Sequence, residues 1–311
     1  MALVMIWGII LLFHDSEKLE LSNSQVSSSH QKLLAKKMVN GIKLLSRLMV
    51  EDGIEISPYS DPNHTGFIGE ELTSLTTTLG SLVSKRTSTN PAFAPLIYDL
   101  ILKAGIKKGD MVAISASGSF PALIFASMLA VEAVGAKPFL ISSIGSSTWG
   151  ANRSQWSWLD MERVFYEHQL IKSRSRFISP GGPDDQGPNL FENSLDLVNQ
   201  IAKRNGIPLL KSISLQEAIE IRMKLYLKED PSLFINIGGS HVSLGGCAHG
   251  HQFPPGIIFQ ALSCNHTEKG LIIRFLELGT PVLNLLDIPA IALENGLPID
   301  PVPLPVANDQ I

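Results

Sequence analysis

Beyond Pro91 the chain alternates short apolar segments with longer helical ones, and this alternation constrains the fold more than any other feature. Segments with strand character lie at 111–115, 137–142, 176–179, 207–210, 233–237 and 281–285, and helical patterns lie at 93–104, 121–134, 159–169, 190–205, 215–227, 269–278 and 288–295. Strands that alternate with helices form βαβ units. The sequence therefore predicts an α/β fold with a mainly parallel, Rossmann-like sheet and helices on both of its faces.

Upstream of this region the pattern is helical first and irregular afterwards. Residues 32–50 carry apolar side chains at helical spacing, and Gly53 follows as a C-terminal cap. Residues 57–90 are rich in turn formers and hydroxyls, and an irregular connection of that length is usually functional or disordered. With 44% hydrophobic and 17% charged residues the chain has enough apolar surface for a sizeable core, so we expect residues 32–311 to form a single α/β domain.

Residues 1–13 form a hydrophobic N-terminal segment, and residues 14–31 have the polar, serine-rich composition of a linker. The apolar run is shorter than the about 20 residues that span a bilayer, and no basic residue precedes it as in a secretory signal. Three interpretations stay open: an incomplete membrane anchor, a degenerate signal sequence, or an apolar helix packed on the domain. We favour membrane association or export, because a packed helix usually carries polar residues at helical spacing.

Charge and cysteine content restrict the function further. A net charge of −4 excludes a protein that binds nucleic acid through general electrostatics. Two cysteines, Cys247 and Cys264, are too few for a disulfide-stapled scaffold, although one bridge is possible, so the redox compartment stays open. The same region contains metal-capable histidines, namely His241, His249, His251 and His266. Their spacing matches no standard zinc pattern, and we predict no metal and no cofactor.

The turn after the strand at 111–115 is the first candidate site, because ligands of parallel sheets bind beyond the carboxyl ends of the strands. Gly118 permits close approach of the backbone, and the following helix N-terminus supplies N–H groups and partial positive charge. Ser115, Ser117, Gly118 and Ser119 are therefore candidates for binding phosphate or carboxylate, unless the serines only cap the helix. Ser117 is a weaker candidate nucleophile, since serines replace both glycines of the G-x-S-x-G elbow.

A second candidate region is the hydroxyl-rich segment before Pro91. Lys85, Arg86 and Thr87 in this segment are predicted to hold an acidic ligand through charge-assisted hydrogen bonds. The competing interpretation is a solvated loop. The loop after the strand at 233–237 contributes Gly238 and Gly239, where a ligand could approach the backbone closely.

A third candidate region follows the strand at 137–142. Ser146, Ser147 and Asn152 are predicted to bind ligand there. Asp160 and Glu162, a few residues later, are weak candidates for catalytic acid–base or metal-binding carboxylates. The alternative for Asp160 is a favourable interaction with the dipole at the start of its helix.

The turn at 115–119 also resembles the phosphosugar-binding motif of sugar isomerase (SIS) domains. In that motif a strand ends in S-x-S-G, and the helix that follows leads to a Gly-Ala turn. Ser115, Ser117, Gly118 and the pair Gly135-Ala136 match this pattern, whereas Phe120 stands where the motif usually has threonine. The resemblance covers about thirty residues, and parallel α/β proteins reuse this geometry for unrelated functions.

Several longer strings together resemble one family, the bacterial poly-gamma-glutamate system proteins. They run in order from about Asp61 to Val306, and the most specific are KRTSTNP at 85–91, SGSFPAL at 117–123, STWGAN at 147–152, WLDMERV at 158–164, NIGG at 236–239 and LPIDPVPLP at 297–305. The resemblance implies an accessory component that acts beside the synthase and membrane subunits that make and export this capsule polymer. It also implies a membrane-associated place in the cell envelope, and it carries no settled reaction.

Three functions follow for testing. The first is an accessory protein of poly-γ-glutamate synthesis, export or processing that binds glutamyl carboxylates in its polar loops. The second is an enzyme, either a γ-glutamyl hydrolase or a SIS-like phosphosugar protein, and the third is a structural subunit that contacts partner proteins. A single ligand site requires that Ser117, Ser119, Lys85, Arg86 and Asp160 meet in one pocket.

Overall fold

The structure is a computed structural model that describes residues 29–188, 194–247, 253–260 and 262–305. The predicted hydrophobic segment 1–13 and most of the predicted linker 14–31 lie outside these ranges. Within them, no helix combines the length and the hydropathy that a membrane crossing needs.

A six-stranded sheet forms the centre of the molecule, with the strand order β5-β3-β2-β6-β8-β7. Its strands are β2 (Met111–Ala116), β3 (Lys137–Ser143), β5 (Phe177–Ser179), β6 (Leu233–Ile237), β7 (Gly256–Ile258) and β8 (Val282–Leu285). All neighbours pair in parallel except β7, which lies antiparallel to β8 at one edge. The prediction of an α/β fold with a mainly parallel sheet is confirmed.

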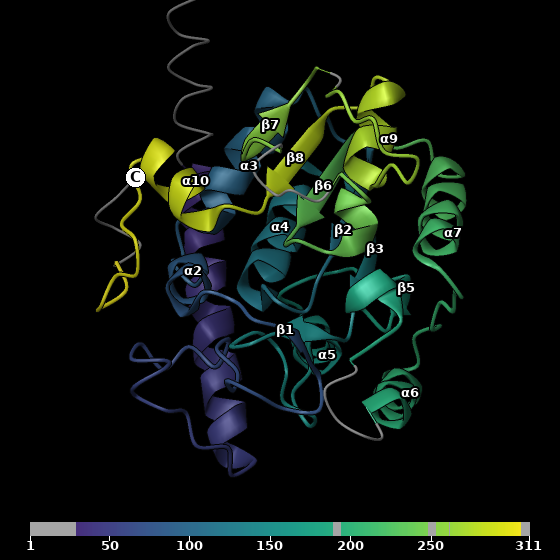
Figure 1. Cartoon of the computed structure of the whole chain (residues 1–311). Coiled ribbons are helices and arrows are strands. Elements are labelled where there is room, and N and C mark those ends of the chain that lie inside the picture. Colours follow the sequence, from purple (N-terminus) through teal and green to yellow (C-terminus); the bar gives the residue numbers. More distant parts are fainter. Residues whose placement is uncertain (1–28, 189–193, 248–252, 261, 306–311) are drawn as a thin grey trace, which may run out of the picture.

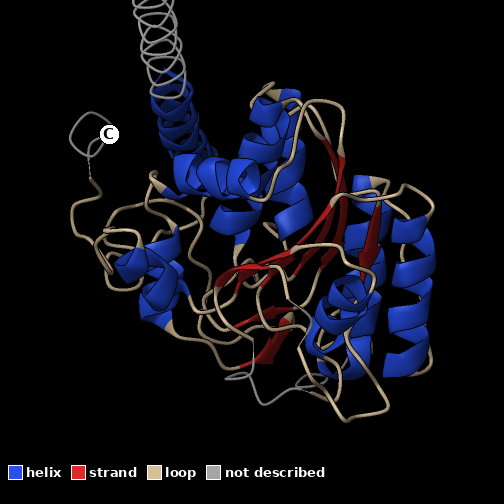
Figure 2. Cartoon of the chain, turned by 90° about the horizontal axis from the view of Figure 1, so that it is seen from above, coloured by secondary structure: helices blue, strands red, loops and turns tan. Residues whose placement is uncertain are grey.

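Helices cover both faces of the sheet, as Figures 1 and 2 show. The helices are α2 (Leu82–Ser88), α3 (Phe93–Lys103), α4 (Pro121–Val134), α5 (Trp158–Glu167), α6 (Ser194–Asn205), α7 (Leu215–Leu227), α8 (His241–Leu244), α9 (Leu271–Glu277) and α10 (Ile288–Glu294), with a 3₁₀ turn, η1, at Pro183–Asp185. Alternate residues of β2 face opposite ways. Val112 and Ile114 pack in the core with α3, α4 and α10, whereas Ala113 packs with α7 and α9.

A long helix at residues 29–51 precedes the sheet and confirms the helix predicted at 32–50. Its buried Leu45 and Met49 belong to the same core as Phe67 and Phe125. The rings of Phe67 and Phe125 lie 6.2 Å apart, so the helix and the loop after it close over α4. This packing buries the apolar side chains that lie along one side of the helix.

The segment predicted as a long irregular connection, 57–90, contains a strand and a helix at its end. β1 (Thr76–Thr78) pairs in parallel with the two-residue strand β4 (Ser146–Ser147), and α2 follows directly. Ser81 caps α2 by accepting a hydrogen bond from the N–H of Ser84. Thr87 and Ser88 donate their hydroxyl protons to carbonyl groups of the preceding turn. These internal hydrogen bonds compensate for the weak helix propensity of Ser and Thr, which is why composition alone misses this helix.

The strand predicted at 207–210 is reduced to one bridge between Leu209 and Ile178. The carbonyl of Pro208 accepts from the N–H of Ile178, and the N–H of Leu210 donates to the carbonyl of Ile178. Pro208 has no N–H of its own, so the ladder cannot continue. The edge strand β7 and the short helix α8 were not predicted.

Candidate functional site

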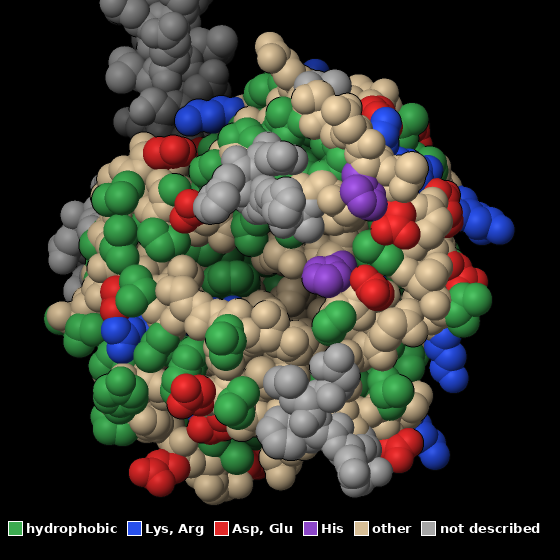
Figure 3. Space-filling model, in the orientation of Figure 1, with side chains coloured by type: hydrophobic (Ala, Val, Ile, Leu, Met, Phe, Trp, Pro, Cys, Tyr) green, Lys and Arg blue, Asp and Glu red, His purple; other side chains and the backbone are tan. Residues whose placement is uncertain are grey.

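A cavity of about 410 Å³ lies at the carboxyl ends of the parallel strands. Loops that follow β2, β3, β5, β6 and β8 line it, together with the segment from β1 to α2. Figure 3 shows the hollow near the centre of this face, with histidine and acidic side chains beside it. The place agrees with the general position of ligand sites in open parallel sheets.

Lys85 on α2 is the main electrostatic feature of the cavity. The side chain is 2% exposed, and its Nζ donates to the main-chain carbonyl of Ser119 and, over 2.7 Å, to Oγ of Ser147. The Nζ also lies 3.8 Å from the centre of the Phe120 ring, within the range of a cation–π contact. In the described part of the chain no carboxylate forms an ion pair with Lys85. Burial lowers the pKa of Lys85 from 10.5 to about 7.

Three serines beside this lysine are linked by hydrogen bonds. The Oγ atoms of Ser117 and Ser119 lie 2.7 Å apart, and the N–H of Ser147 donates to Oγ of Ser119 over 2.9 Å. Ser117 and Ser119 come from the turn before α4, and Ser147 comes from β4. Gly118 permits the close contact between these loops, because a Cβ at this position would lie 3.0 Å from the carbonyl oxygen of Ser143. The serines therefore connect two loops that the sheet places side by side.

The backbone N–H groups of the same turn are already paired within the protein. The N–H of Ser117 donates to Ile237, that of Ser119 to Oγ of Ser117, and that of Phe120 to the carbonyl of Ser117. The N–H of Gly118 faces Oγ of Ser143 at 3.4 Å. We predicted that these N–H groups would bind an anion. Lys85 and the hydroxyls of Ser117, Ser119 and Ser147 line the cavity and are the candidate donors instead.

The opposite wall of the cavity comes from the loop after β5. Gly181, Gly182, Asp184 and Asp185 all have positive φ angles, and backbone of that kind clusters at functional sites. Asp185 is buried, forms an ion pair with Arg222 over 2.8 Å, and accepts the hydroxyl proton of Ser179 over 2.7 Å. The negative charge of Asp185 is therefore compensated by Arg222.

His241 stands on the rim of the cavity at the start of α8. Its Nδ1 lies 3.3 Å from a carboxylate oxygen of Asp184, and both side chains are about half exposed or more. This pair has access to solvent, in contrast to the buried lysine and serines. It supplies a polar rim to a cavity whose interior includes several hydroxyl groups.

Five of the predicted ligand-binding residues line the cavity: Lys85, Ser117, Ser119, Ser147 and Gly239. The single site of five residues that the sequence predicted is therefore not formed, because Arg86 and Asp160 do not line the cavity. A smaller set, Ser117, Ser119 and Lys85, does come together there.

Arg86 and Thr87 hold the C-terminal segment. Nε of Arg86 donates to the carboxylate of Asp300 over 2.7 Å, and a second guanidinium nitrogen forms an ion pair with the same group. The N–H of Asp300 donates to Oγ1 of Thr87 over 2.9 Å. Arg86 and Thr87 are therefore hydrogen-bonded to Asp300, whereas Lys85 on the same helix lines the cavity.

Asp160 and Glu162, the weak catalytic candidates, are buried residues of α5. Asp160 forms a capping box with Ser157 at the start of α5 and an ion pair with Arg204. Glu162 is buried and accepts from both the N–H and the hydroxyl of Ser175 over 2.8 and 2.7 Å. Burial raises the pKa of Glu162 from 4.5 to about 7. Neither carboxylate lines the cavity.

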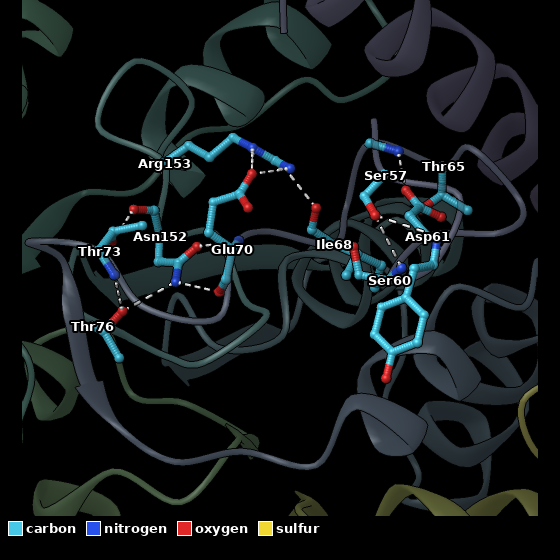
Figure 4. A network of polar contacts seen from close by, with 12 residues as sticks. Ser57, Ser60, Asp61, Thr65, Ile68, Glu70, Thr73, Thr76, Asn152 and Arg153 are labelled. Atoms are coloured by element: carbon cyan, nitrogen blue, oxygen red, sulfur yellow. Dashed lines mark hydrogen bonds and ion pairs between the residues drawn. The ribbon is translucent and has the colours of Figure 1, made fainter. Parts of the chain in front are cut away.

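Asn152 stabilises the loop that precedes β1 through hydrogen bonds, as Figure 4 shows. Its Oδ1 accepts from the N–H of Glu70 over 2.9 Å, and its Nδ2 donates to the carbonyl of Glu70 and to Oγ1 of Thr76. The neighbouring Arg153 forms an ion pair with Glu70 and donates to the carbonyl of Ile68. The predicted ligand role of Asn152 is thus replaced by a role in loop geometry.

The remaining predicted residues, Ser115, Ser146 and Gly238, lie behind the wall of the cavity. Oγ of Ser115 accepts from the hydroxyl of Ser243 over 3.2 Å, and Oγ of Ser146 donates to the carbonyl of Ser147 over 2.9 Å. The α-carbon of Gly238 lies close to Ser117, since a Cβ added there would be 3.3 Å from the Cβ of Ser117. Gly118 lies behind the wall in the same way, against the loop after β3.

Sequence analysis did not name several residues of the cavity. They are Thr77, Thr78, Ser81, Ser84, Ser143, Gly181, Gly182 and Asp185. Gly181, Gly182 and Asp185 could have been predicted as cavity residues, because they belong to the loop that begins with Pro180-Gly-Gly directly after the strand at 176–179.

Cys247 and Cys264 form a disulfide bond. Within the described ranges no three side chains of His, Cys, Asp or Glu gather as a metal site. His249 and His251 lie outside the described residues.

No protein-family model and no curated protein matches the chain. Two solved structures of 2-hydroxyisobutyryl-CoA ligase are similar to parts of it. The postadenylation state in complex with R3-HIB-AMP has 10% identity over 60% of this chain and 47% of that chain, with a TM-score of 0.14. The open conformation in complex with 2-HIB-AMP and CoA has 13% identity over 75% of this chain and 58% of that chain, with a TM-score of 0.15. The chain spans about half the length of these ligases, and at such TM-scores the likeness supports no argument about function.

Proposed function

We propose that the cavity binds a carboxylate ligand, and that this ligand is a glutamyl group of poly-γ-glutamate or of its precursor. In this proposal the protein is an accessory component of a system that synthesises, exports or processes the polymer. The observation that carries the proposal is Lys85, a buried lysine that faces a hydroxyl-lined cavity and has no carboxylate partner among the described residues.

A bound carboxylate would supply the missing counter-charge. Burial makes the ammonium form of Lys85 unfavourable, and a negative charge within hydrogen-bond distance would favour it again. The hydroxyls of Ser117, Ser119 and Ser147 are close enough to share a carboxylate with the lysine, since all three line the same cavity. The volume of about 410 Å³ lies in the range of about 300–1,000 Å³ that is typical of small-molecule sites.

A phosphosugar ligand is the second candidate, because Ser117 and Ser119 of the SIS-like turn do line the cavity. A phosphate at such a turn is usually held by free backbone N–H groups of the helix N-terminus. Here the N–H groups of residues 117, 119 and 120 are already paired internally. The carboxylate proposal therefore ranks first.

The envelope location and the partnership with synthase subunits are parts of the same proposal. They rest on the resemblance of the long sequence strings and on the apolar segment at 1–13. The disulfide between Cys247 and Cys264 supports an oxidising compartment, where such bonds persist.

Calorimetric titration tests the binding proposal. At pH 6.5 we expect tri-γ-glutamate to bind the wild-type protein and to bind Lys85→Met at least about tenfold more weakly, because a charge-assisted hydrogen bond is lost. Lys107→Met is the control, since Lys107 is exposed and precedes the amino end of β2, whereas the cavity lies at the carboxyl ends of the strands. Binding of glucosamine 6-phosphate in preference to tri-γ-glutamate would contradict the proposal and favour the phosphosugar function.

A further inference from the structure

The contact between Lys85 and Ser147 has the geometry of a nucleophile and its base. Nζ of Lys85 lies 2.7 Å from Oγ of Ser147, and both residues line the cavity. From this contact we infer that Ser147 is a nucleophile activated by Lys85, and that the cavity is the active site of a serine–lysine acyl hydrolase. Nucleophile and base within hydrogen-bond reach are the general signature of this chemistry.

The main chain holds Ser147 in place relative to the lysine. Its N–H donates to Oγ of Ser119, and its carbonyl accepts from the N–H of Gly150 and the hydroxyl of Ser146. The short strand β4 fixes the backbone further by pairing with β1. The backbone position of Ser147 is thus set by groups other than its base, and such positioning is part of the preorganisation that catalysis requires.

Ser147 is favoured over Ser117 and Ser119, the two cavity serines that are hydrogen-bonded to each other beside it. Oγ of Ser119 accepts the N–H of Ser147 and pairs with Oγ of Ser117, while Oγ of Ser117 also accepts the N–H of Ser119. Lys85 reaches the main-chain carbonyl of Ser119 and not its hydroxyl. The base therefore lies beside Ser147. Among the described residues no such base is hydrogen-bonded to Oγ of Ser117, the nucleophile considered from the sequence.

The surroundings allow Lys85 to act as a neutral base. Among the described residues, Asp185 and His241 are the other titratable side chains on the cavity wall, and they are paired with Arg222 and Asp184 respectively. The lowered pKa of Lys85 is caused by burial, without a charge pair that would hold the proton. A base that titrates near neutral pH is effective in general base catalysis.

The reaction begins with transfer of the Ser147 hydroxyl proton to neutral Nζ of Lys85 while Oγ attacks the carbonyl carbon of an amide. The ammonium of Lys85 then donates this proton to the amide nitrogen, the C–N bond breaks, and an amine leaves from the acyl-serine ester. Lys85 next takes a proton from water, the hydroxide adds to the ester carbonyl, and the C–O bond to Ser147 breaks as the proton returns to Oγ. The net reaction is amide plus water to carboxylic acid plus amine.

The choice of a γ-glutamyl amide as substrate rests on the proposed function, whereas the nucleophile assignment does not. The two proposals use the lysine in opposite protonation states. Acylation needs the neutral amine, and the carboxylate product is held by the ammonium. A bound carboxylate should therefore inhibit acylation competitively.

Covalent labelling tests the nucleophile without a known substrate. A fluorophosphonate, which phosphonylates activated serines, is incubated with the full-length protein, and peptide mass spectrometry locates the adduct. We expect the adduct on Ser147, a rate that rises with pH through about 7, and slowing by tri-γ-glutamate. Lys85→Met should lower the labelling rate about 100-fold or more, the usual contribution of a general base.

Two serine variants complete the test. Ser147→Ala should abolish labelling and hydrolysis of poly-γ-glutamate, and it should bind tri-γ-glutamate more weakly than wild type because one hydroxyl of the site is lost. A cooperative urea-unfolding transition shows that the variant is folded. Ser232→Ala, at an exposed serine that precedes β6 and lies outside the cavity, should keep the label on Ser147. Equal labelling of Ser147→Ala and wild type, an adduct on another serine, or no adduct at all would overturn the assignment. Labelling of Ser147 without binding of tri-γ-glutamate would keep the nucleophile and refute the glutamyl ligand.

Discussion

Replacing Lys85 by methionine should change how the stability of the protein depends on pH. The pKa of this lysine is 10.5 in the unfolded chain and about 7 in the folded protein. Between these two values the unfolded state binds a proton that the folded state does not. Stability therefore rises with pH through this window, and it stops rising above about 10.5.

The magnitude follows from the two pKa values. A tenfold change in proton affinity is worth about 1.4 kcal/mol, so the whole window contributes about 5 kcal/mol. Between pH 7 and pH 9 the gain is about 2 kcal/mol, because the folded lysine is still half protonated at pH 7. Methionine has a similar length and no titrating group, so Lys85→Met removes this gain.

Urea denaturation at pH 6, 7, 8 and 9 measures the effect. The quantity of interest is the free energy of unfolding of wild type minus that of Lys85→Met at each pH, in which contributions of other titrating groups cancel. We expect this difference to rise by about 2 kcal/mol from pH 7 to pH 9 in favour of wild type. A difference that stays constant with pH would show that Lys85 keeps its ordinary pKa in the folded protein, and the account of the cavity would be wrong.

Three further substitutions test the surroundings of the cavity. The free energy of unfolding of the wild-type protein should fall by about 3 kcal/mol between pH 4.5 and pH 7, since the buried carboxyl of Glu162 binds its proton more tightly in the folded state than in the unfolded state. Glu162→Gln should lack this fall. The same pH dependence of the unfolding free energy in wild type and variant, measured by urea denaturation, would contradict this. Gly118→Ala should cost about 1–3 kcal/mol, because its Cβ would press on the carbonyl of Ser143, and an unchanged melting temperature would argue against the close contact. Asp300→Asn should weaken the Arg86 ion pair by about 1 kcal/mol and leave tri-γ-glutamate binding unchanged in calorimetry. A loss of binding would show that the pair of Arg86 and Asp300 contributes to the ligand site.

The fold and part of the site were predictable from the sequence for physical reasons. Alternating strand and helix patterns determine a parallel sheet, and the carboxyl ends of its strands locate the cavity. Lys85 and Ser147 were named from polar loops. Their contact, however, depends on the pairing of β1 with β4, which joins segments about seventy residues apart that spacing cannot relate.

The misassigned residues have a common physical origin. Arg86, Asn152 and Asp160 carry polar groups that suit a ligand site, and each of them is instead satisfied by a distant segment of the chain: Asp300, Glu70 and Arg204. A buried polar side chain needs a partner, and the sequence does not show whether that partner is a ligand or the protein itself. Lys85 differs because its charge finds no carboxylate within the described residues.

The central claim is that Lys85 and the serines around it form one carboxylate site, and the pH dependence of binding tests it most directly. Calorimetry of tri-γ-glutamate from pH 6 to pH 9 should show an affinity that falls about tenfold per pH unit above about 7, with uptake of one proton on binding. Lys85→Met should show weak binding without this dependence. Strong binding that is independent of pH in the wild-type protein, or unchanged in Lys85→Met, would contradict the claim.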